Sequence, residues 1–87
     1  MVRSDELREL IAGHSEWLLV RESGRTFPFY SSEIEITNDG KKAHFGFLDD
    51  GGFHTWRLNG FACEGDEISI DAAGAFARKR ESMRLVP

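Results

Sequence analysis

The sequence is poor in the residues that build small covalent scaffolds, because its 87 residues include one cysteine, Cys63, and two prolines. A single cysteine excludes an internal disulfide framework and a cysteine-rich zinc site, and it favours a reducing, cytoplasmic location. No apolar run approaches the roughly 18 residues that a membrane-spanning helix requires, and residues 1–15 do not form a signal peptide. We therefore expect no membrane partner.

The motifs that commonly carry chemistry are also missing. Neither of the glycine-rich phosphate-binding patterns, GxxxxGK[ST] and GxGxxG, occurs in the chain. His14, His44 and His54 are not spaced as metal ligands, and the acids Asp49 and Asp50 lack the alternating oxygen ligands of a calcium loop. We expect no metal, no cofactor and no catalytic activity.

Basic residues are fewer than acidic ones: 11 lysines and arginines against 15 aspartates and glutamates give a net charge of −4. Because neutralisation of phosphates supplies most non-specific affinity for nucleic acids, this balance disfavours nucleic-acid binding. The bases are concentrated near the C-terminal end, where Arg78, Lys79, Arg80 and Arg84 stand against a single acid, Glu81. A short basic strip is thus the exception in an acidic chain.

The chain does contain a regular pattern of apolar residues. Apolar residues spaced three and four apart from Leu7 to Ile11, behind the candidate N-cap Ser4, predict an amphipathic helix over about residues 4–13. From residue 16 onward, short apolar stretches alternate with tight-turn signals, which is typical of an antiparallel β-meander. The turn signals are Ser23-Gly24, Asp39-Gly40, Asp49 to Gly52, and Glu64-Gly65.

The strand registers can be tested, since a correct pairing places the apolar residues of both strands on one face. A two-residue turn at Asp39-Gly40 pairs Ile36 with Ala43, and a loop of two or four residues around 49–52 pairs Phe45 with Trp56. The two hairpins then agree on one inward face. Its members are Ile34, Ile36, Ala43, Phe45, Phe47, Trp56 and Leu58.

The first hairpin follows from the same reasoning. A turn at Ser23-Gly24 pairs Leu18 with Phe29 and leaves Trp17 and Tyr30 together on the outer face. In the last hairpins, a turn at Glu64-Gly65 pairs Phe61 with Ile68, and the parity of Phe61 requires a β-bulge at Asn59-Gly60. The final strand directs Met83 and Leu85 inward and its arginines outward.

The fold class that we predict is α+β and mainly β, with the N-terminal helix packed on a curled antiparallel meander of about six or seven strands. The curled sheet would form a roll or a partly open barrel. Residues 1–87 form a single domain, with strands from about residue 16 to residue 86. Because the chain stops within a strand-like run, we expect it to be the N-terminal domain of a longer protein.

The stretch HFGFLDD, from His44 to Asp50, resembles the aromatic strand of cold-shock domains, and FHTW resembles their second aromatic strand. The resemblance implies outward rings that stack on single-stranded nucleic acid. The register above instead turns Phe45 and Phe47 inward, and the lysine of the family motif is missing. We therefore assign the chain to no family.

One candidate polar site emerges from the register. It places Glu35, His44 and Arg57 in an outward row across three adjacent strands. A carboxylate beside an imidazole favours the charged ring and fixes its tautomer, as an acid–base site requires. The alternative is a cross-strand charge ladder on a solvated face, which is the commoner arrangement.

The function that we predict is that of a non-catalytic accessory or interaction domain, which binds another domain of its parent protein or a separate protein partner. Its contact surface would combine outward aromatic rings with the basic strip, namely Trp17, Tyr30, Arg78, Arg80 and Arg84. Two alternatives stay open: single-stranded nucleic-acid binding by the same side chains on a small β-barrel, and an enzyme site around Glu35 and His44. Acids of the chain itself could also neutralise the arginines.

Overall fold

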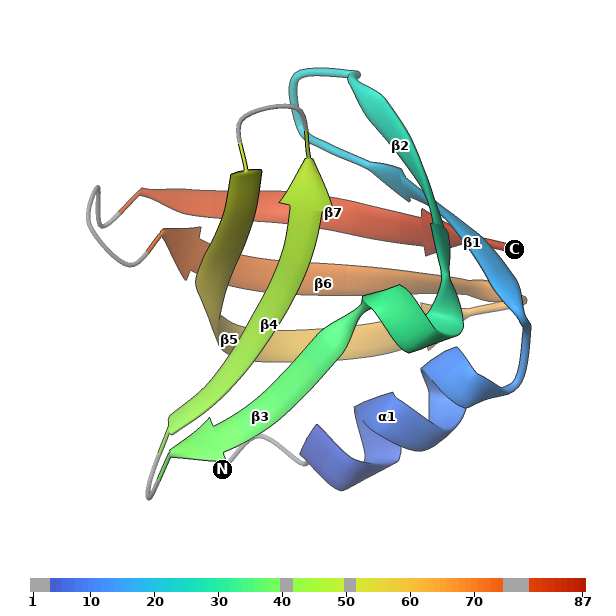
Figure 1. Ribbon diagram of the computed structural model, residues 1–87, viewed down its shortest axis with the longest axis horizontal. Coiled ribbons are helices and arrows are strands. Elements are labelled where there is room, and N and C mark those ends of the chain that lie inside the picture. Colours follow the sequence, from blue (N-terminus) through green and yellow to red (C-terminus); the bar gives the residue numbers. More distant parts are fainter. Residues whose placement is uncertain (1–3, 40–41, 50–51, 75–78) are drawn as a thin grey trace.

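The computed structural model describes residues 4–39, 42–49, 52–74 and 79–87. One helix is followed by strands, in the predicted order (Figure 1). The elements are α1 (Ser4–Ala12), β1 (Glu16–Val20), β2 (Thr26–Tyr30), the 3-10 turn η1 (Ser31–Glu33), β3 (Glu35–Asp39), β4 (Lys42–Asp49), β5 (Gly52–Glu64), β6 (Glu67–Gly74) and β7 (Arg80–Val86). The predicted α+β, mainly β fold class is confirmed.

The strands form one antiparallel sheet in the order β2-β1-β7-β6-β5-β4-β3. Strands β3 to β7 are a continuous meander, and the β1–β2 hairpin is added to its far side because β1 pairs with β7. The sheet curls into a half-barrel, in which β4 passes in front of β6 and β7 (Figure 1). Its edge strands are β2 and β3, so Pro28 lies on an edge strand, as expected of a residue without an N–H group.

The core fills the inside of this curl. It contains every residue of the predicted inward face except Trp56, which is partly buried and packs against it. Met83 and Leu85 are fully buried, as the parity of the last strand predicts. Phe45 and Phe47 are likewise fully buried, which confirms the predicted parity of β4 and leaves neither ring free to stack on a base.

The strand β5 carries the predicted β-bulge. Leu58 pairs with Ala72 and Gly60 pairs with Asp71, so Asn59 is the additional residue. An extra residue reverses the alternation of side chains, and both Leu58 and Phe61 therefore contact the core.

Helix α1 lies beside β3 at one end of the curled sheet (Figure 1). Leu7 and Ile11 form its buried stripe, in agreement with the predicted amphipathic pattern. Two polar contacts fix the helix to β3: Arg8 Nη2 donates to the carbonyl oxygen of Ile36 at 2.6 Å, and Asn38 Nδ2 donates to Ser4 Oγ at 2.6 Å. The helix is thus held by both apolar and polar contacts.

The β1–β2 register differs from the prediction by one residue. Trp17, rather than Leu18, pairs with Phe29. The loop contains three residues, 22–24, because the Arg21 amide donates to the Arg25 carbonyl and the Gly24 amide to the Arg21 carbonyl. Gly24 has a φ of 94°, as in three-residue hairpin loops that end in a left-handed residue.

Because the loop has three residues instead of two, the side chains of β1 lie on the faces opposite to those predicted. Trp17 and Leu19 face the core, with exposed fractions of 3% and 0%, while Leu18 faces outward. The expectation that Trp17 points outward is therefore wrong, because parity was assigned from a two-residue turn.

Two other hairpins are displaced by two residues. Ile36 pairs with Phe45 rather than with Ala43, and Ile68 pairs with Cys63 rather than with Phe61. A shift of two keeps every side chain on its predicted face, so the burial pattern is unchanged.

The β5–β6 turn explains one of these shifts. Glu64 pairs with Glu67, so the two turn residues are Gly65 and Asp66 instead of the predicted Glu64-Gly65. Gly65, the first of them, has a φ of 65°, a conformation that glycine adopts without steric cost.

Candidate functional site

The predicted polar row is only partly assembled. His44 pairs with Arg57, as predicted, but Glu35 pairs with Gly46 and Thr37 takes the place opposite His44. The two-residue displacement of β3 is the cause. Among the described residues, no hydrogen bond or ion pair joins Glu35, His44 and Arg57, and the expected pairing of Glu35 with His44 is wrong.

The arginines of the basic strip are paired with acids of the neighbouring strand. Arg80 forms an ion pair with Asp71, and Arg84 Nη1 donates to Glu67 Oε1 at 2.9 Å. Both arginines are exposed on the outer side, as predicted, whereas Arg78 lies outside the described residues. The internal neutralisation that the sequence left open is therefore present for these two arginines.

A small apolar surface lies on the outer side of β2, β1 and β7. Leu18 is 37% exposed and Tyr30 is 58% exposed. Leu18 lies between Pro28 of β2 and Val86 of β7. We call Leu18, Pro28, Tyr30 and Val86 the outer patch; Leu18 has the outward place that the sequence assigned to Trp17.

Trp17 instead connects α1 to β1. Its Nε1 donates to the carbonyl oxygen of Ile11 at 2.7 Å, near the C-terminal end of α1. The His14 ring stands edge-on to the indole, with 5.1 Å between ring centroids and 85° between planes. These contacts fix the connection between helix and sheet.

The free edge of β2 offers few hydrogen-bond donors. In an antiparallel ladder, hydrogen-bonded residue pairs alternate with pairs that form no ladder bonds. Two bonds fix this alternation for β1 and β2: the Ser31 amide donates to the Ser15 carbonyl, and the Arg21 amide donates to the Arg25 carbonyl. The pair of Leu18 and Pro28 is therefore one without ladder bonds, and the backbone nitrogen of Pro28 faces the free edge of the sheet. The next edge-facing amide, that of Tyr30, donates to Glu33 Oε1 at 2.7 Å.

The opposite edge, β3, is covered by α1, whose Arg8 guanidinium occupies the Ile36 carbonyl. At both edges of the sheet, side chains therefore occupy or remove backbone groups that a further strand would need for pairing. Such protection opposes the addition of a strand from another chain. Partner binding by strand addition is correspondingly disfavoured, and the outer faces remain as contact surfaces.

A polar cluster that the sequence analysis missed lies near the β1–β2 loop. Arg21 Nε and Nη2 donate to the two carboxylate oxygens of Glu81 at 2.8 and 2.7 Å, with side chains 22% and 12% exposed. These bonds lower the pKa of Glu81 below its usual value. The signal was present in the sequence, because Glu81 has the same parity as the inward-facing Met83 and Leu85.

Trp56 lies beneath this ion pair. The Arg21 guanidinium carbon is 5.0 Å from the centroid of a Trp56 ring, and the indole stacks on Phe47 with 6° between planes. Trp56 Nε1 is buried and has no hydrogen-bond partner within the described part of the chain. The cluster joins Arg21, the residue after β1, to β5 and β7 on the inner side of the half-barrel.

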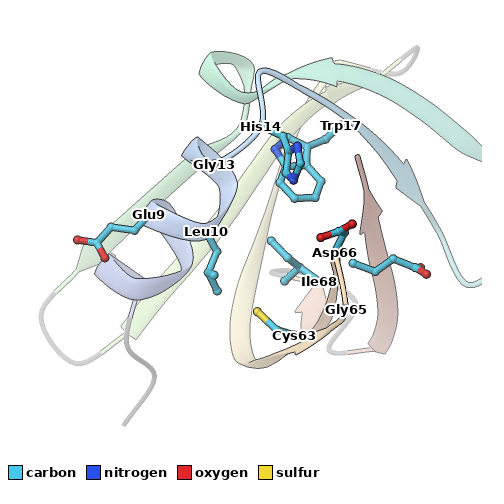
Figure 2. Close-up of a pocket in the computed structure, with 10 residues that line it drawn as sticks. Glu9, Leu10, Gly13, His14, Trp17, Cys63, Gly65, Asp66 and Ile68 are labelled. Carbon is cyan, nitrogen blue, oxygen red and sulfur yellow. The ribbon is translucent and has the colours of Figure 1, made fainter.

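A cleft lies at the α1 end of the sheet, between the helix and the β5–β6 turn (Figure 2). We call it the α1 cleft; it is lined mainly by Leu10, His14, Trp17, Cys63, Asp66 and Ile68 and has a volume of about 240 Å³. Leu10 and Ile68 face the opening from opposite walls, and the rings of His14 and Trp17 lie at one end of it (Figure 2).

The charged side chains that line the α1 cleft are acidic. Its lining residues include Glu9, Asp66 and Glu67 but no lysine or arginine from the described residues. Glu67 is paired with Arg84, and the side chain of Glu9 points away from the opening (Figure 2). Asp66 is thus the carboxylate in the cleft without an ion-pair partner in the described segments.

Comparisons with protein-family models, with curated proteins and with solved structures give no match to this chain. Within the described segments, no three histidine, cysteine or acidic side chains gather in an arrangement that could hold a metal ion. In the same segments no helix has the length and apolarity to cross a membrane.

Proposed function

We propose that this chain is a non-catalytic interaction domain that binds a protein partner through the outer patch. The observation that carries this proposal is the exposure of Leu18 and Tyr30 beside Pro28 and Val86, on the outside of a sheet whose inner face is filled by its own core. Contiguous exposed apolar patches mark protein contact sites, whereas apolar residues scattered singly over a surface do not.

Two further observations favour a protein over a nucleic acid as partner. Arg80 and Arg84 already bind carboxylates of β6, so a phosphate would have to displace Asp71 or Glu67. Tyr30 is an exposed ring, but Trp17, the second ring of that alternative, is buried, and so are Phe45 and Phe47 of the stretch that resembles cold-shock domains. Sequence-tolerant binding of single strands depends on several exposed rings along a basic groove.

The separation of Glu35 from His44 supports the non-catalytic part of the proposal. An acid–base site requires a carboxylate within hydrogen-bond reach of the imidazole that it orients. The observed register places Gly46 opposite Glu35, and no hydrogen bond joins the acid to His44.

A photo-crosslinking amino acid at Leu18 tests the proposal in the cells that produce the protein, with the same amino acid at Thr55 as the control. Both positions are exposed on strands, and Thr55 lies on β5. We expect a protein adduct from position 18 that position 55 does not give. The partner is then purified, and Leu18→Lys should weaken its binding at least tenfold while Thr55→Lys leaves it unchanged. Equal adducts from both positions, or equal affinities of both lysine variants, would contradict the proposal.

A further inference from the structure

The α1 cleft has the features of a side-chain pocket rather than of a small-molecule site. Its volume of about 240 Å³ is below the range of roughly 300–1,000 Å³ that encloses typical small ligands. It is partly open rather than enclosed, and its lining comes from α1 on one side and from the β5–β6 turn on the other. A single long side chain that projects from another protein fits this shape better than a ligand that must be enclosed.

The walls of the cleft select a side chain with an apolar stem. Leu10 of α1 and Ile68 of β6 face one another across the opening (Figure 2). Ile68 is 2% exposed and belongs to the core, so the accessible apolar surface of the cleft comes mainly from the half-buried Leu10, which packs against that core. The aliphatic portions of arginine and lysine bury well against such surfaces while the charged group stays near water.

The charge around the cleft selects a cation. The β5–β6 turn carries Glu64, Asp66 and Glu67, and among these three carboxylates the one with a cationic partner in the described segments is Glu67, which binds Arg84. The protein as a whole has a net charge of −4, which adds long-range attraction for basic partners. A cationic occupant would gain an ion pair with the Asp66 carboxylate, which is exposed and otherwise solvated by water.

The aromatic end of the cleft favours a planar cation. Trp17 is 3% exposed and is held by its hydrogen bond to Ile11, so the exposed His14 ring, at 85° to the indole, is the aromatic surface that an occupant of the cleft would meet. A guanidinium can stack on a ring and donate two parallel hydrogen bonds to a carboxylate, whereas an ammonium acts as a point charge.

From these features we infer that the α1 cleft binds an arginine side chain presented by a basic segment of a protein partner, with Asp66 as its carboxylate contact. This inference concerns the end of the sheet at α1 and does not depend on the outer patch. A failure of either proposal therefore leaves the other in place.

A peptide titration followed by two-dimensional ¹H–¹⁵N NMR tests the inference. The probe is the acetylated, amidated peptide Gly-Leu-Arg-Leu-Gly, compared with peptides in which lysine, norleucine or glutamate replaces the arginine. We expect saturable shifts of the backbone amides of Leu10, Gly13 and Asp66 and of the Trp17 indole N–H. The lysine peptide should bind at least threefold more weakly than the arginine peptide, and the norleucine and glutamate peptides at least tenfold more weakly.

Matched variants separate a specific contact from a general charge effect. Asp66→Asn removes the carboxylate of the cleft, and Glu35→Gln removes an exposed carboxylate of β3 with the same change in net charge. We expect the Asp66→Asn protein, with the rest of its amide spectrum unchanged, to bind the arginine peptide at least fivefold more weakly and the Glu35→Gln protein to bind as before. Equal weakening by both variants, shifts scattered over the surface, or equal binding of the norleucine peptide would overturn the inference.

Discussion

Arg21 and Glu81 are 60 residues apart in the sequence, and in the fold the guanidinium of the first binds both carboxylate oxygens of the second. The pair connects the loop end of the β1–β2 hairpin to β7, and the guanidinium lies over the ring of Trp56. Because both side chains are largely buried, the loss of one partner leaves a charge that water solvates poorly. The ion pair is therefore expected to contribute measurably to stability, in contrast to the exposed ion pairs of the outer face.

Replacing Glu81 with glutamine should lower the free energy of unfolding by about 2 kcal/mol at pH 7, since a hydrogen bond to a charged group contributes about 1.5–3 kcal/mol. Urea unfolding followed by tryptophan fluorescence measures this loss. Glu35→Gln is the control, because Glu35 is exposed and forms no ion pair among the described residues; its effect should stay within about 0.5 kcal/mol.

The same pair predicts a dependence of stability on pH. Arg21 lowers the pKa of Glu81 in the folded state, so the unfolded chain takes up the proton first as the pH falls. The contribution of Glu81 is complete above about pH 5, and it is lost as the pH drops through the lowered, folded-state pKa. The stability difference between the natural protein and Glu81→Gln should shrink on acidification, and a constant difference from pH 7 to pH 3 would contradict this assignment.

The orientation of β1 is testable with two neighbouring leucines. Leu19→Ala should lower the free energy of unfolding by about 2–5 kcal/mol, the usual cost of truncating a buried leucine. Leu18→Ala should cost less than about 1 kcal/mol, because Leu18 faces outward. The opposite ranking of the two variants in thermal or urea unfolding would show that the register derived from the sequence, not the observed one, is correct.

The three-residue loop at residues 22–24 depends on glycine. Gly24 has a φ of 94°, where a side chain introduces backbone strain, so Gly24→Ala should cost about 1 kcal/mol or more. Gly60 is the matched control, since its φ lies outside that region and an added Cβ would meet nothing within 4 Å. Gly60→Ala should leave the urea midpoint nearly unchanged, and an equal loss at both positions would argue against the loop geometry.

The protection of the β2 edge makes a further prediction. Pro28→Thr together with Glu33→Ala supplies an N–H group at position 28 and frees the Tyr30 amide, so the edge gains two unsatisfied donors. We expect the double variant to self-associate at concentrations at which the natural protein does not, as measured by sedimentation velocity. Thr26→Ser, on the same strand, is the control and should sediment like the natural protein.

The sequence predicts the faces of the strands well because burial has a strict period of two along a strand. Ile34, Phe45 and Met83 all lie inside as predicted, and the bulge at Asn59 was recognised from the one break in that period. The register itself is underdetermined, because shifts of two residues leave each face unchanged. The displacement that separates Glu35 from His44 therefore could not be seen from parity.

In the first hairpin the register shift is one residue instead of two, so the predicted faces of β1 were wrong. There a single extra loop residue before Gly24 reversed the face of β1, and with it the assignment of Trp17 and Leu18. Loop length depends on the local backbone conformation of Gly24, which the dipeptide Ser23-Gly24 does not specify on its own. The α1 cleft was missed for a different reason, because His14 and Asp66 come together only when the helix has packed on the sheet.

The pairing of β1 with β7 has a consequence for how the protein is made. A nascent chain on the ribosome has β1 available early, but the strand on which it must dock is the last one to be synthesised. Until β7 emerges, β1 is paired only with β2 and β6 only with β5, and the core residues that β7 covers are open to water. Folding should therefore be completed only after synthesis of the whole sheet, at the slow rates that long-range contacts impose, and truncation before β7 should yield chains that chaperones retain.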